Sequence, residues 1–461
     1  MKFVLVYPPF KKFAAVQPPL GLAYLAAVLK KRSAIVNVID ANAERLNVEQ
    51  TVKKILESDP GVLCFTMLTP LVDVSLQIIE QVKLKKDIPI VAGGPHPTIM
   101  PDEILKNNKI DIVVRGEGED TISDLYDYFT GAKQLDSISG VSFRLNDKIF
   151  HNPSRPSIEN LDEIPFPAWE LFPLSRYASF ARKKKFSLPI ITSRGCPFGC
   201  IFCYKGVFGR KYRIRSTQNV VSEIEYLIKK FNIEEFAVVD DNFALNEERA
   251  LQICEEIIMQ NLVIPWTAAG GLTVRTSDKV LRKMKDAGCY RVAFGVESGN
   301  QDVLEYVDKG ITLGQIGNAF ASAKKASLET IGFFMIGNLS ETEKTINETI
   351  DFAIRLDPDW AQFTVATPYP GTKMYETIKK EGRFLVDKWE DFASYDRAIF
   401  SYGSLTPDLL NRKCREAYCR FYLRPRIIVK KIKSITSFFE LKNLFRSFIG
   451  FFQLIKPKFK R

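Results

Sequence analysis

The sequence predicts an α/β protein: a doubly wound parallel sheet, then a partial (β/α)6 TIM-type barrel, then a helical and basic C-terminal tail. Three observations predict this fold. Apolar strand patterns alternate with helical patterns in two separate series, which is typical of parallel sheets. A proline-rich stretch separates the two series. The end of the chain mixes aromatic and aliphatic residues with Lys and Arg.

The first series predicts a ligand-binding domain over residues 1–150. Its strands are expected at 2–7, 34–39, 62–67, 88–92 and 110–114, and its helices at 20–29, 49–56, 72–82 and 120–129. A short strand pair is expected at 140–143 and 148–151. In a doubly wound sheet the ligand binds beyond the carboxyl ends of the strands. We therefore look for binding residues where these strands end.

The second series predicts a partial barrel over residues 188–385, after a proline-rich linker at 151–187 and before an extension at 386–461. Its strands are expected at 190–193, 236–239, 266–269, 291–296, 330–336 and 361–365, with helices between them, as at 220–231, 247–260 and 346–355. In a barrel of this kind the chemistry lies at the carboxyl ends of the strands.

The composition restricts the class of protein. Of the 461 residues, 46% are hydrophobic and 26% are charged, as in ordinary globular chains, which excludes a disordered or collagen-like chain. The net charge is +11, but residues 421–461 carry 11 Lys and Arg against one Glu, a balance of +10. The rest of the chain is nearly neutral, which argues against a nucleic-acid partner. No apolar run approaches the roughly 20 residues of a membrane-spanning helix, and we expect a cytoplasmic protein.

Three of the eight cysteines form a C-x3-C-x2-C pattern directly after an apolar strand, at Cys196, Cys200 and Cys203. Such a cluster in a cytosolic chain indicates metal or redox chemistry. Thiolates hold iron–sulfur clusters, and three of them leave one iron of a 4Fe–4S cluster open. Gly195 and Gly199 allow the backbone to turn tightly around it. Zinc is the alternative, but a closed zinc site needs four ligands, and no fourth Cys or His lies nearby.

This cysteine pattern, with Phe202 just before the last Cys, resembles the cluster loop of radical S-adenosylmethionine (radical SAM) enzymes. The resemblance implies that Cys196, Cys200 and Cys203 hold a 4Fe–4S cluster. Its open iron would bind the amino and carboxylate groups of S-adenosylmethionine. Electron transfer would then give a 5′-deoxyadenosyl radical. The resemblance also suggests that Phe202 flanks the adenine.

Other strand ends of the predicted barrel match positions where this family contacts S-adenosylmethionine. Glu297 and Ser298 end the fourth strand, where a polar group on the ribose or methionyl part is expected; the alternative is a helix cap. Asp240 and Asp241 end the second strand, at the position of the methionyl amino contact; the alternative is a solvated turn.

Two further positions follow the same resemblance. Arg275 follows the third strand and could pair with a carboxylate, although a surface arginine is the alternative. Gly337 ends the fifth strand in a pattern that resembles the adenine-flanking strand of the family.

The strand ends of the N-terminal domain resemble a cobalamin-binding domain that precedes the radical barrel in one large subfamily. The motifs that carry this likeness are Pro-Pro-Leu-Gly-Leu-Ala, Gly-Gly-Pro-His and Arg-Gly-Glu-Gly-Glu. The cobalamin-binding residues that the resemblance implies are Pro9, Thr66, Leu68, Gly93, Gly94, His96, Gly116, Glu117 and Gly118.

One departure concerns cobalt. The Asp-x-His-x-x-Gly motif of many cobalamin domains is absent, and no His precedes His96. We therefore expect no protein histidine on the lower face of cobalt. His96 is expected either to contact cobalamin or to cap its loop. The alternative for the whole domain is a structural role without a cofactor.

The tail at 424–461 interleaves Phe and Ile with Lys and Arg, which is typical of a segment that lies on an anionic membrane surface. The alternative is a helix packed on the protein's own barrel. Cys414 and Cys419 have no further ligands nearby and are expected to serve packing.

The resemblance implies a cobalamin-dependent radical SAM enzyme. We expect a C-methyltransferase that acts on an unactivated carbon of a hydrophobic or lipid-like small molecule. One S-adenosylmethionine would supply the methyl group through cobalamin, and a second would supply the radical that abstracts hydrogen. A reductant such as flavodoxin or ferredoxin is expected. The alternatives are a cyclase, oxidase or rearrangement enzyme without methyl transfer, and a cobalamin or iron–sulfur sensor.

Overall fold

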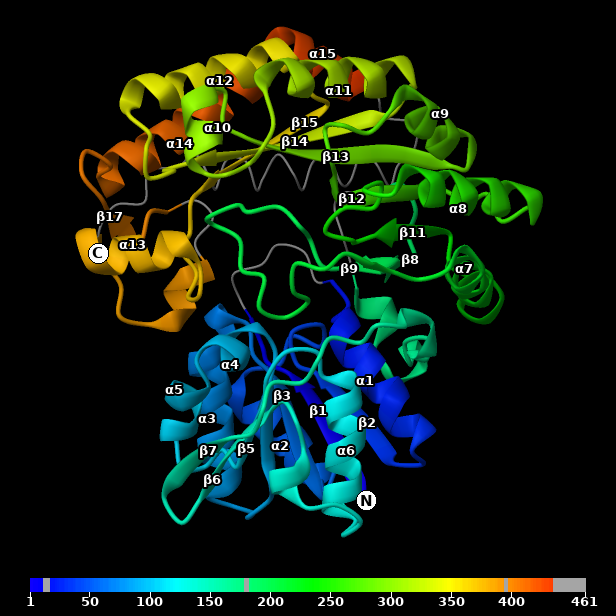
Figure 1. The fold of residues 1–461 in the computed structure, drawn as a ribbon, viewed down its shortest axis with the longest axis vertical. Coiled ribbons are helices and arrows are strands. Elements are labelled where there is room, and N and C mark those ends of the chain that lie inside the picture. The colour runs from blue at the N-terminus through cyan, green and yellow to red at the C-terminus, as the bar shows by residue number, and fades with distance from the viewer. Residues whose placement is uncertain (11–16, 178–181, 394–396, 434–461) are drawn as a thin grey trace.

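The computed structural model describes residues 1–10, 17–177, 182–393 and 397–433. Figure 1 shows two α/β units, one above the other, with loops of the chain lying between them. We call β1 to β7 with their helices the N-terminal unit, and β8 to β15 with theirs the barrel unit. The α/β class predicted from the two alternating series is confirmed.

The N-terminal unit is a seven-stranded sheet in the order β2-β1-β3-β4-β5-β6-β7. Its first five strands are parallel: β1 (Lys2–Tyr7), β2 (Ile35–Asp40), β3 (Val62–Thr66), β4 (Ile90–Gly93) and β5 (Ile112–Val114). The predicted strand pair, β6 (Val141–Leu145) and β7 (Lys148–His151), continues the sheet: β6 pairs antiparallel with β5, and β7 pairs antiparallel with β6. Asn146 and Asp147 have φ of 48° and 61°, the left-handed conformation that a two-residue hairpin turn requires.

Helices cover both faces of this sheet (Figure 1). Residues of β1 alternate between two cores: Phe3 and Leu5 pack into the core that includes α1 and α6, while Val4 and Val6 pack into the core that includes α2 and α3. The helices are α1 (Leu20–Lys31), α2 (Val48–Glu57), α3 (Val72–Lys83), α4 (Pro95–Ile99), α5 (Pro101–Lys106) and α6 (Glu119–Phe129), with the 3-10 turns η1 (Thr69–Leu71) and η2 (Leu135–Ser137).

The proline-rich stretch between the units packs against the N-terminal unit. Trp169 is fully buried, the amide of Ala168 donates to the carbonyl of Ala23 on α1, and Tyr177 donates to the buried carboxylate of Asp40. Its 3-10 turns are η3 (Leu161–Glu163), η4 (Trp169–Leu171) and η5 (Leu174–Arg176). This connection is therefore a packed part of the fold.

The barrel unit is an open sheet of six parallel strands in the order β15-β14-β13-β12-β11-β8. The strands are β8 (Ser187–Ile190), β11 (Glu235–Val238), β12 (Trp266–Leu272), β13 (Cys289–Glu297), β14 (Glu329–Ile336) and β15 (Trp360–Val365). The helices are α7 (Thr217–Phe231), α8 (Glu247–Met259), α9 (Asp278–Asp286), α10 (Gln301–Tyr306), α11 (Leu313–Lys325) and α12 (Glu343–Leu356). β8 and β15 form the two edges, so the sheet is a partial barrel.

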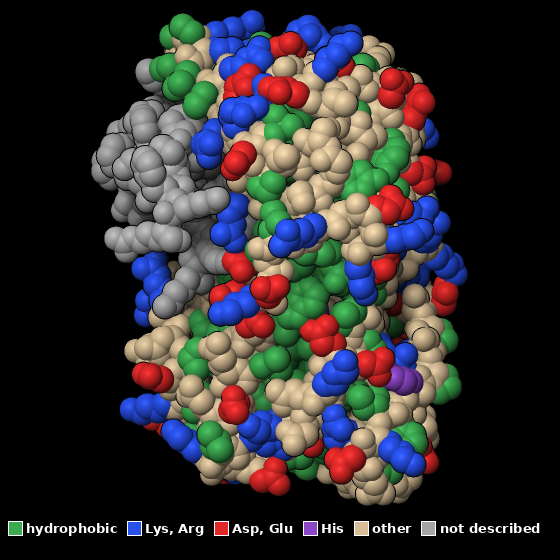
Figure 2. Space-filling model, turned by 90° about the vertical axis from the view of Figure 1, so that its left-hand side faces the viewer, with side chains coloured by type: hydrophobic (Ala, Val, Ile, Leu, Met, Phe, Trp, Pro, Cys, Tyr) green, Lys and Arg blue, Asp and Glu red, His purple; other side chains and the backbone are tan. Residues whose placement is uncertain are grey.

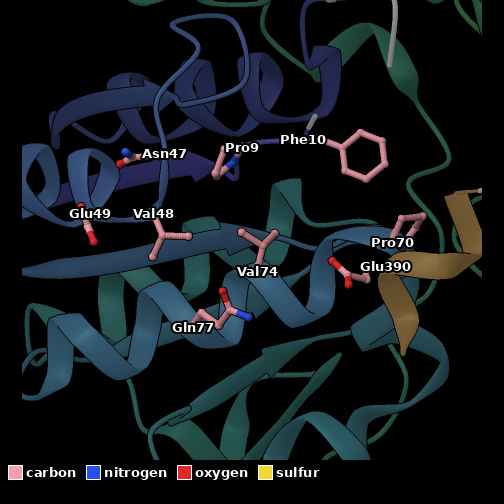
Figure 3. A pocket seen from close by; sticks show the side chains of 9 residues that line it. All are labelled: Pro9, Phe10, Asn47, Val48, Glu49, Pro70, Val74, Gln77 and Glu390. Carbon is pink, nitrogen blue, oxygen red and sulfur yellow. The ribbon is translucent and has the colours of Figure 1, made fainter. Parts of the chain in front are cut away.

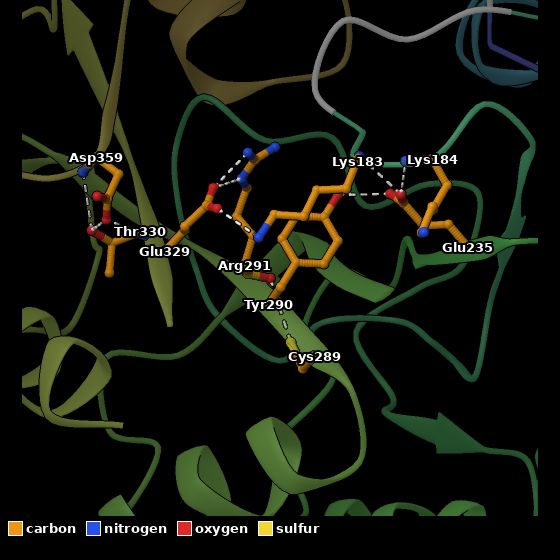
Figure 4. Close-up of polar contacts among 9 residues, drawn as sticks. All are labelled: Lys183, Lys184, Glu235, Cys289, Tyr290, Arg291, Glu329, Thr330 and Asp359. Carbon is orange, nitrogen blue, oxygen red and sulfur yellow. Dashed lines mark hydrogen bonds and ion pairs between the residues drawn. The ribbon is translucent and has the colours of Figure 1, made fainter. Parts of the chain in front are cut away.

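Polar contacts join the amino ends of these strands (Figure 4). The carboxylate of Glu235 on β11 accepts from the hydroxyl of Tyr290 on β13 at 2.7 Å. Arg291 pairs with Glu329 on β14 at 2.6 Å, and Asp359 accepts from the amide of Thr330 at 2.8 Å. This network fixes the end of the barrel unit opposite to the strand ends where the predicted site residues lie.

The C-terminal extension covers the open edge of the barrel and returns to the N-terminal unit. Tyr422 on α14 exchanges hydrogen bonds with both the amide (3.0 Å) and the carbonyl (2.8 Å) of Ala361 on β15. The elements are α13 (Lys373–Glu381), β16 (Arg383–Phe384), η6 (Trp389–Ala393), β17 (Phe400–Ser401), α14 (Pro407–Tyr422) and α15 (Pro425–Lys433). An edge strand with unpaired backbone groups is thus capped by a helix.

Most of the predicted membrane-contacting tail, residues 434–461, lies outside the described residues. Within the described part, Leu423, Ile428 and Val429 are exposed, whereas Ile427 is buried. No helix among the described residues is long and apolar enough to cross a membrane. On the face in Figure 2, acidic and basic side chains are interspersed over the described residues, which agrees with the near-neutral charge of the body.

Candidate active site

The three cysteines lie in a loop that a short hairpin presents between the two units (Figure 1). The hairpin strands are β9 (Ser193–Arg194) and β10 (Arg213–Ile214), which pair antiparallel. We call residues 195–212 the cysteine loop. Gly195 has φ of 86°, and a Cβ there would overlap the carbonyl of Lys211, so only glycine fits where the loop leaves β9.

Cys196 and Cys200 are half-buried residues, and Cys203 is an exposed residue whose thiol is partly desolvated. Burial raises the pKa of Cys200 and of Cys203. In the described part, no three Cys, His, Asp or Glu side chains surround a point where a single ion could bind. A 4Fe–4S cluster does not require its ligands to surround one point, because each thiolate binds a different iron. Three thiols on one loop fit such a cluster.

Two lysines supply positive charge near the thiols of the cysteine loop. Burial lowers the pKa of Lys205, but the nearby thiols of Cys203 and Cys196 outweigh it and raise the pKa. For Lys309, the lowering effect of burial is outweighed mainly by the carboxylate of Glu297. These cations would stabilise the negative charge that thiolate ligands bring to a cluster.

Glu297 is the last residue of β13 and has φ of 63°, a left-handed conformation that non-glycine residues adopt at a cost. Its carboxylate pairs with Lys309 at 2.8 Å. Ser298 is fully buried; its hydroxyl contacts that of Thr349 at 3.1 Å and accepts from the amide of Asn300. The strand end thus carries one charged pair near the cysteines and one hydroxyl with internal partners.

The two aspartates at the end of β11 lie in different surroundings. Asp240 is buried and accepts from the amide and hydroxyl of Thr192, at 2.5 and 2.6 Å, and from the hydroxyl of Ser193 at 2.6 Å. Asp241 is an exposed residue whose carboxyl is partly desolvated, which raises its pKa, and Lys205 partly offsets this effect. Asp240 therefore positions the start of the cysteine hairpin, while the carboxylate of Asp241 is open to a ligand.

The remaining predicted contacts of the barrel are spread around the sheet. Arg275 is exposed and donates to the carbonyl of Gly310 at 2.6 Å. Phe202 is partly buried against the core. Gly337 has φ of 101°, and its amide donates to the carboxylate of Glu341 at 2.6 Å. Burial raises the pKa of Glu341 to about 8. The sequence interpretation missed Glu341, because the burial of an acid in the loop after a strand leaves no signal in the sequence.

In the N-terminal unit, glycines bring the strand ends together and leave space. Gly94 has φ of 104°, and a Cβ there would lie 3.1 Å from the carbonyl oxygen of Met67 and 3.2 Å from the hydroxyl of Thr66. Gly116 has φ of 78°, and a Cβ there would meet no protein atom within 4 Å. A Cβ at Gly118 would lie 3.1 Å from Leu25. The edge therefore combines close backbone packing with room at Gly116, which fits a bulky cofactor.

The other predicted cobalamin residues line the same edge. The carbonyl of Gly93 accepts from the amide of Met67 at 2.8 Å, and Leu68 directly precedes η1. Pro9 is buried and lines a pocket of about 380 Å³ (Figure 3). The full lining is Pro9, Phe10, Asn47, Val48, Glu49, Pro70, Val74, Gln77 and Glu390. Glu390 comes from η6, so the extension contributes to this edge.

His96 is fully buried beneath the extension. Its Nδ1 lies 3.2 Å from the hydroxyl of Thr69, and its ring meets Trp389 edge-on, with 4.8 Å between centroids. The Nε1 of Trp389 donates to Glu103 at 2.5 Å. Burial lowers the pKa of His96 to about 4, so the ring is neutral at pH 7. The sequence interpretation missed Trp389, because a residue nearly 300 positions away covers this loop.

The carboxylate of Glu117 has its partners in the barrel unit and in the connector. It lies 2.7 Å from Arg194 on β9 and 2.7 Å from Arg213 on β10, and it also accepts from the amide of Ile158 at 2.9 Å. Neither arginine was singled out from the sequence. A loop of the N-terminal unit is therefore bonded directly to the hairpin that carries the cysteines.

Fold and site together define a two-unit α/β protein whose cysteine loop faces the strand ends of a second ligand-binding unit. A family model for the B12 binding domain matches residues 10–126, and one for the radical SAM superfamily matches residues 190–353. An uncharacterized methyltransferase of Pyrococcus horikoshii is 37% identical over 94% of this chain and 95% of its own length. The anaerobic magnesium-protoporphyrin IX monomethyl ester cyclase of Rubrivivax gelatinosus is 30% identical over 92% of this chain and 78% of its own.

The fold has a counterpart among solved structures. The radical S-adenosylmethionine methyltransferase TsrM of Kitasatospora setae, solved with cobalamin and a [4Fe-4S] cluster, gives a TM-score of 0.72 at 16% identity, over 92% of this chain and 89% of that one. At this identity the likeness concerns the fold. The chain belongs to the family of radical SAM enzymes that carry a B12-binding domain. A 4Fe–4S cluster, S-adenosylmethionine and cobalamin are its cofactors.

Proposed function

We propose that this enzyme is a cobalamin-dependent C-methyltransferase that acts on an unactivated carbon of a hydrophobic small molecule. One observation carries the proposal: the hairpin that carries the cysteine loop is bonded to the loop of the B12-binding unit that holds Gly116, where open space remains. A radical formed at the first site and a methyl carrier at the second would then share one enclosed volume. The full-length match to a relative described as a methyltransferase supports it.

When bound, the cofactors supply a deoxyadenosyl radical and a transferable methyl group. The chain's own residues would hold and position them. Cys196, Cys200 and Cys203 would hold the cluster. The exposed Asp241 and the Glu297–Lys309 pair would contact S-adenosylmethionine, while Asp240 and Ser298, whose polar atoms have internal partners, would position the neighbouring backbone.

The further S-adenosylmethionine contacts in the proposal are Phe202, Arg275 and Gly337. The proposed cobalamin edge is formed by Pro9, Thr66, Leu68, Gly93, Gly94, Gly116 and Gly118. His96 would act by holding the β4 loop, because its ring is buried under Trp389.

A second function is radical ring closure or oxidation without methyl transfer. It is favoured by the match to the cyclase of Rubrivivax gelatinosus, which covers 92% of this chain. The two functions leave different products from the cofactor. A methyltransferase converts one S-adenosylmethionine to S-adenosylhomocysteine for each deoxyadenosine formed, whereas a cyclase gives deoxyadenosine alone.

The test uses the anaerobically purified holoenzyme, reduced by flavodoxin or ferredoxin, with methyl-labelled S-adenosylmethionine and small hydrophobic metabolites. We expect mass spectrometry to find the label on carbon in an extractable product, with S-adenosylhomocysteine and deoxyadenosine near a ratio of one. Deoxyadenosine with neither S-adenosylhomocysteine nor label in any product would refute methyl transfer and favour the second function.

The substrate class and the cellular location are also proposals. The basic, Phe-rich tail at 424–461 would bind the cytoplasmic face of a membrane. It would thereby bring the enzyme to a hydrophobic substrate. We expect the full chain to sediment with vesicles that contain anionic lipid, and a chain shortened at residue 433 to stay in solution. Equal sedimentation of both chains would remove the tail from the proposal.

A further inference from the structure

We propose that Glu117 is a positioning residue, which clamps the cysteine loop onto the B12-binding unit and sets the distance between the two cofactors. The inference rests on the proposed function for its catalytic consequence, but the clamp itself is defined by contacts within the chain. Glu117 lies in the loop between β5 and α6, and its two arginine partners lie on the hairpin that carries the cysteines.

The geometry of the clamp follows from the hairpin. Arg194 and Arg213 are a directly opposed pair in the antiparallel β9–β10 ladder, so their side chains leave the same face. Glu117 accepts from Nη1 of Arg194 through one carboxylate oxygen and from Nη1 of Arg213 through the other, each at 2.7 Å. One carboxylate therefore holds both strands at once.

Charge and burial make the clamp specific. Glu119, the first residue of α6, accepts from Nη2 of Arg194 at 2.5 Å. Two carboxylates thus balance two guanidinium groups, and all four side chains are at most 8% exposed. The aromatic ring of Phe208 lies 5.0 Å from the guanidinium carbon of Arg194. A buried charge that loses its partner is strongly destabilising. Other arrangements of these four side chains that leave a charge unpaired are therefore disfavoured.

Few residues separate the clamp from the cysteines on one side and from the proposed cobalamin edge on the other. Arg194 is two residues before Cys196, and Gly195 between them has φ of 86°, with no room for a side chain beside the carbonyl of Lys211. Glu117 is flanked by Gly116 and Gly118, at the proposed cobalamin edge. A shift of the clamp would therefore be transmitted to the cysteine loop and to the cobalamin edge together, since no flexible linker intervenes.

The test measures the magnetic coupling between the reduced cluster and cob(II)alamin in the holoenzyme. This dipolar coupling decreases with the cube of the distance between the two spins, so it reports a change in that distance. We compare wild type with Glu117→Gln and with Glu329→Gln. Glu329 pairs with Arg291 at the opposite end of the barrel unit, so the second variant is a matched control. We expect Glu117→Gln to lose at least half of the coupling or to spread it over several values, while Glu329→Gln retains the wild-type value.

A double variant guards against a simple folding defect. Glu117→Gln with Arg213→Gln removes the clamp but leaves Arg194 paired with Glu119, so no net charge is buried. If this variant folds and binds both cofactors with the wild-type coupling, the clamp is refuted. A changed coupling at unchanged cluster and cobalamin content supports it.

Product analysis separates the clamp from the proposed function. We expect the double variant to form deoxyadenosine within about twofold of wild type but S-adenosylhomocysteine at least tenfold more slowly. Absence of S-adenosylhomocysteine in wild type would refute methyl transfer, and the coupling measurement would still decide the clamp.

Discussion

Each cysteine of the loop has its own environment, although the three share one motif. Cys203 is exposed, while Cys196 and Cys200 are half-buried, and Lys205 and Lys309 lie among them. The motif spacing was sufficient to predict the three ligands. It could not reveal the lysines, because Lys309 is brought to the loop by the connection between α10 and α11, more than one hundred residues along the chain.

Cluster loss is the first prediction at this scale. Cys203→Ala removes one thiolate ligand, so we expect iron content to fall by more than half and deoxyadenosine formation to be lost. Cys419→Ala on α14 serves as the control, since this half-buried cysteine lies away from the loop. Equal iron content and activity in both variants would remove Cys203 from the cluster site.

The charged pair of Glu297 and Lys309 gives the second prediction. A hydrogen bond to a charged group contributes about 1.5–3 kcal/mol, so Glu297→Gln should lower kcat/KM for S-adenosylmethionine cleavage by about tenfold to a hundredfold. Glu305→Gln on α10, an exposed residue, should change it by less than twofold. Steady-state deoxyadenosine formation measures both; an unchanged value for Glu297→Gln would exclude a contact with the cofactor.

At the scale of elements, local sequence patterns predicted most strands and helices, because the parallel strands of both sheets are apolar runs that alternate with helical patterns. What they could not give was the packing of distant elements. The predicted linker is held against α1 by the amide of Ala168, next to the buried Trp169, and η6 lies on His96. Both contacts depend on tertiary packing, and short irregular segments carry no periodic signal of it.

The cap on β15 gives a prediction about stability. Tyr422→Phe keeps the ring but leaves the amide and carbonyl of Ala361 without this partner, which should cost about 1–3 kcal/mol of unfolding free energy. Tyr226→Phe on α7, whose hydroxyl accepts from the exposed Lys230, should cost less than about 0.5 kcal/mol. Urea denaturation of both variants checks this difference; equal losses would contradict the cap.

The burial of His96 under η6 predicts a pH dependence. The folded-state pKa is about 4, below the ordinary value of 6.5, so the unfolded chain binds more protons between these values. This histidine should therefore reduce stability progressively as pH falls from 6.5 to 4, by about 3 kcal/mol in total. His96→Gln should flatten that slope in urea denaturation, whereas His151→Gln at an exposed site should retain it. Parallel slopes for all three proteins would mean that His96 is accessible.

At the scale of the whole molecule, contacts between the two units in the described part include the Glu117 clamp, the packed connector, and η6, where the amide of Glu390 donates to Asp73 on α3 at 2.8 Å. The motifs allowed us to predict two cofactor units in one chain. They did not reveal which loops touch, because ion pairs between distant segments leave no spacing pattern. The arrangement encloses the cysteine loop between the units, as radical chemistry requires.

The most direct test of the central claim is to purify the chain without oxygen, with and without cobalamin, and to quantify iron, cobalt, deoxyadenosine and S-adenosylhomocysteine after reduction. We predict about four irons and one cobalt per chain. We also predict deoxyadenosine in both preparations and S-adenosylhomocysteine only in the preparation that contains cobalamin. S-adenosylhomocysteine formation that is independent of cobalamin, or its absence from both preparations, would contradict methyl transfer through the N-terminal unit.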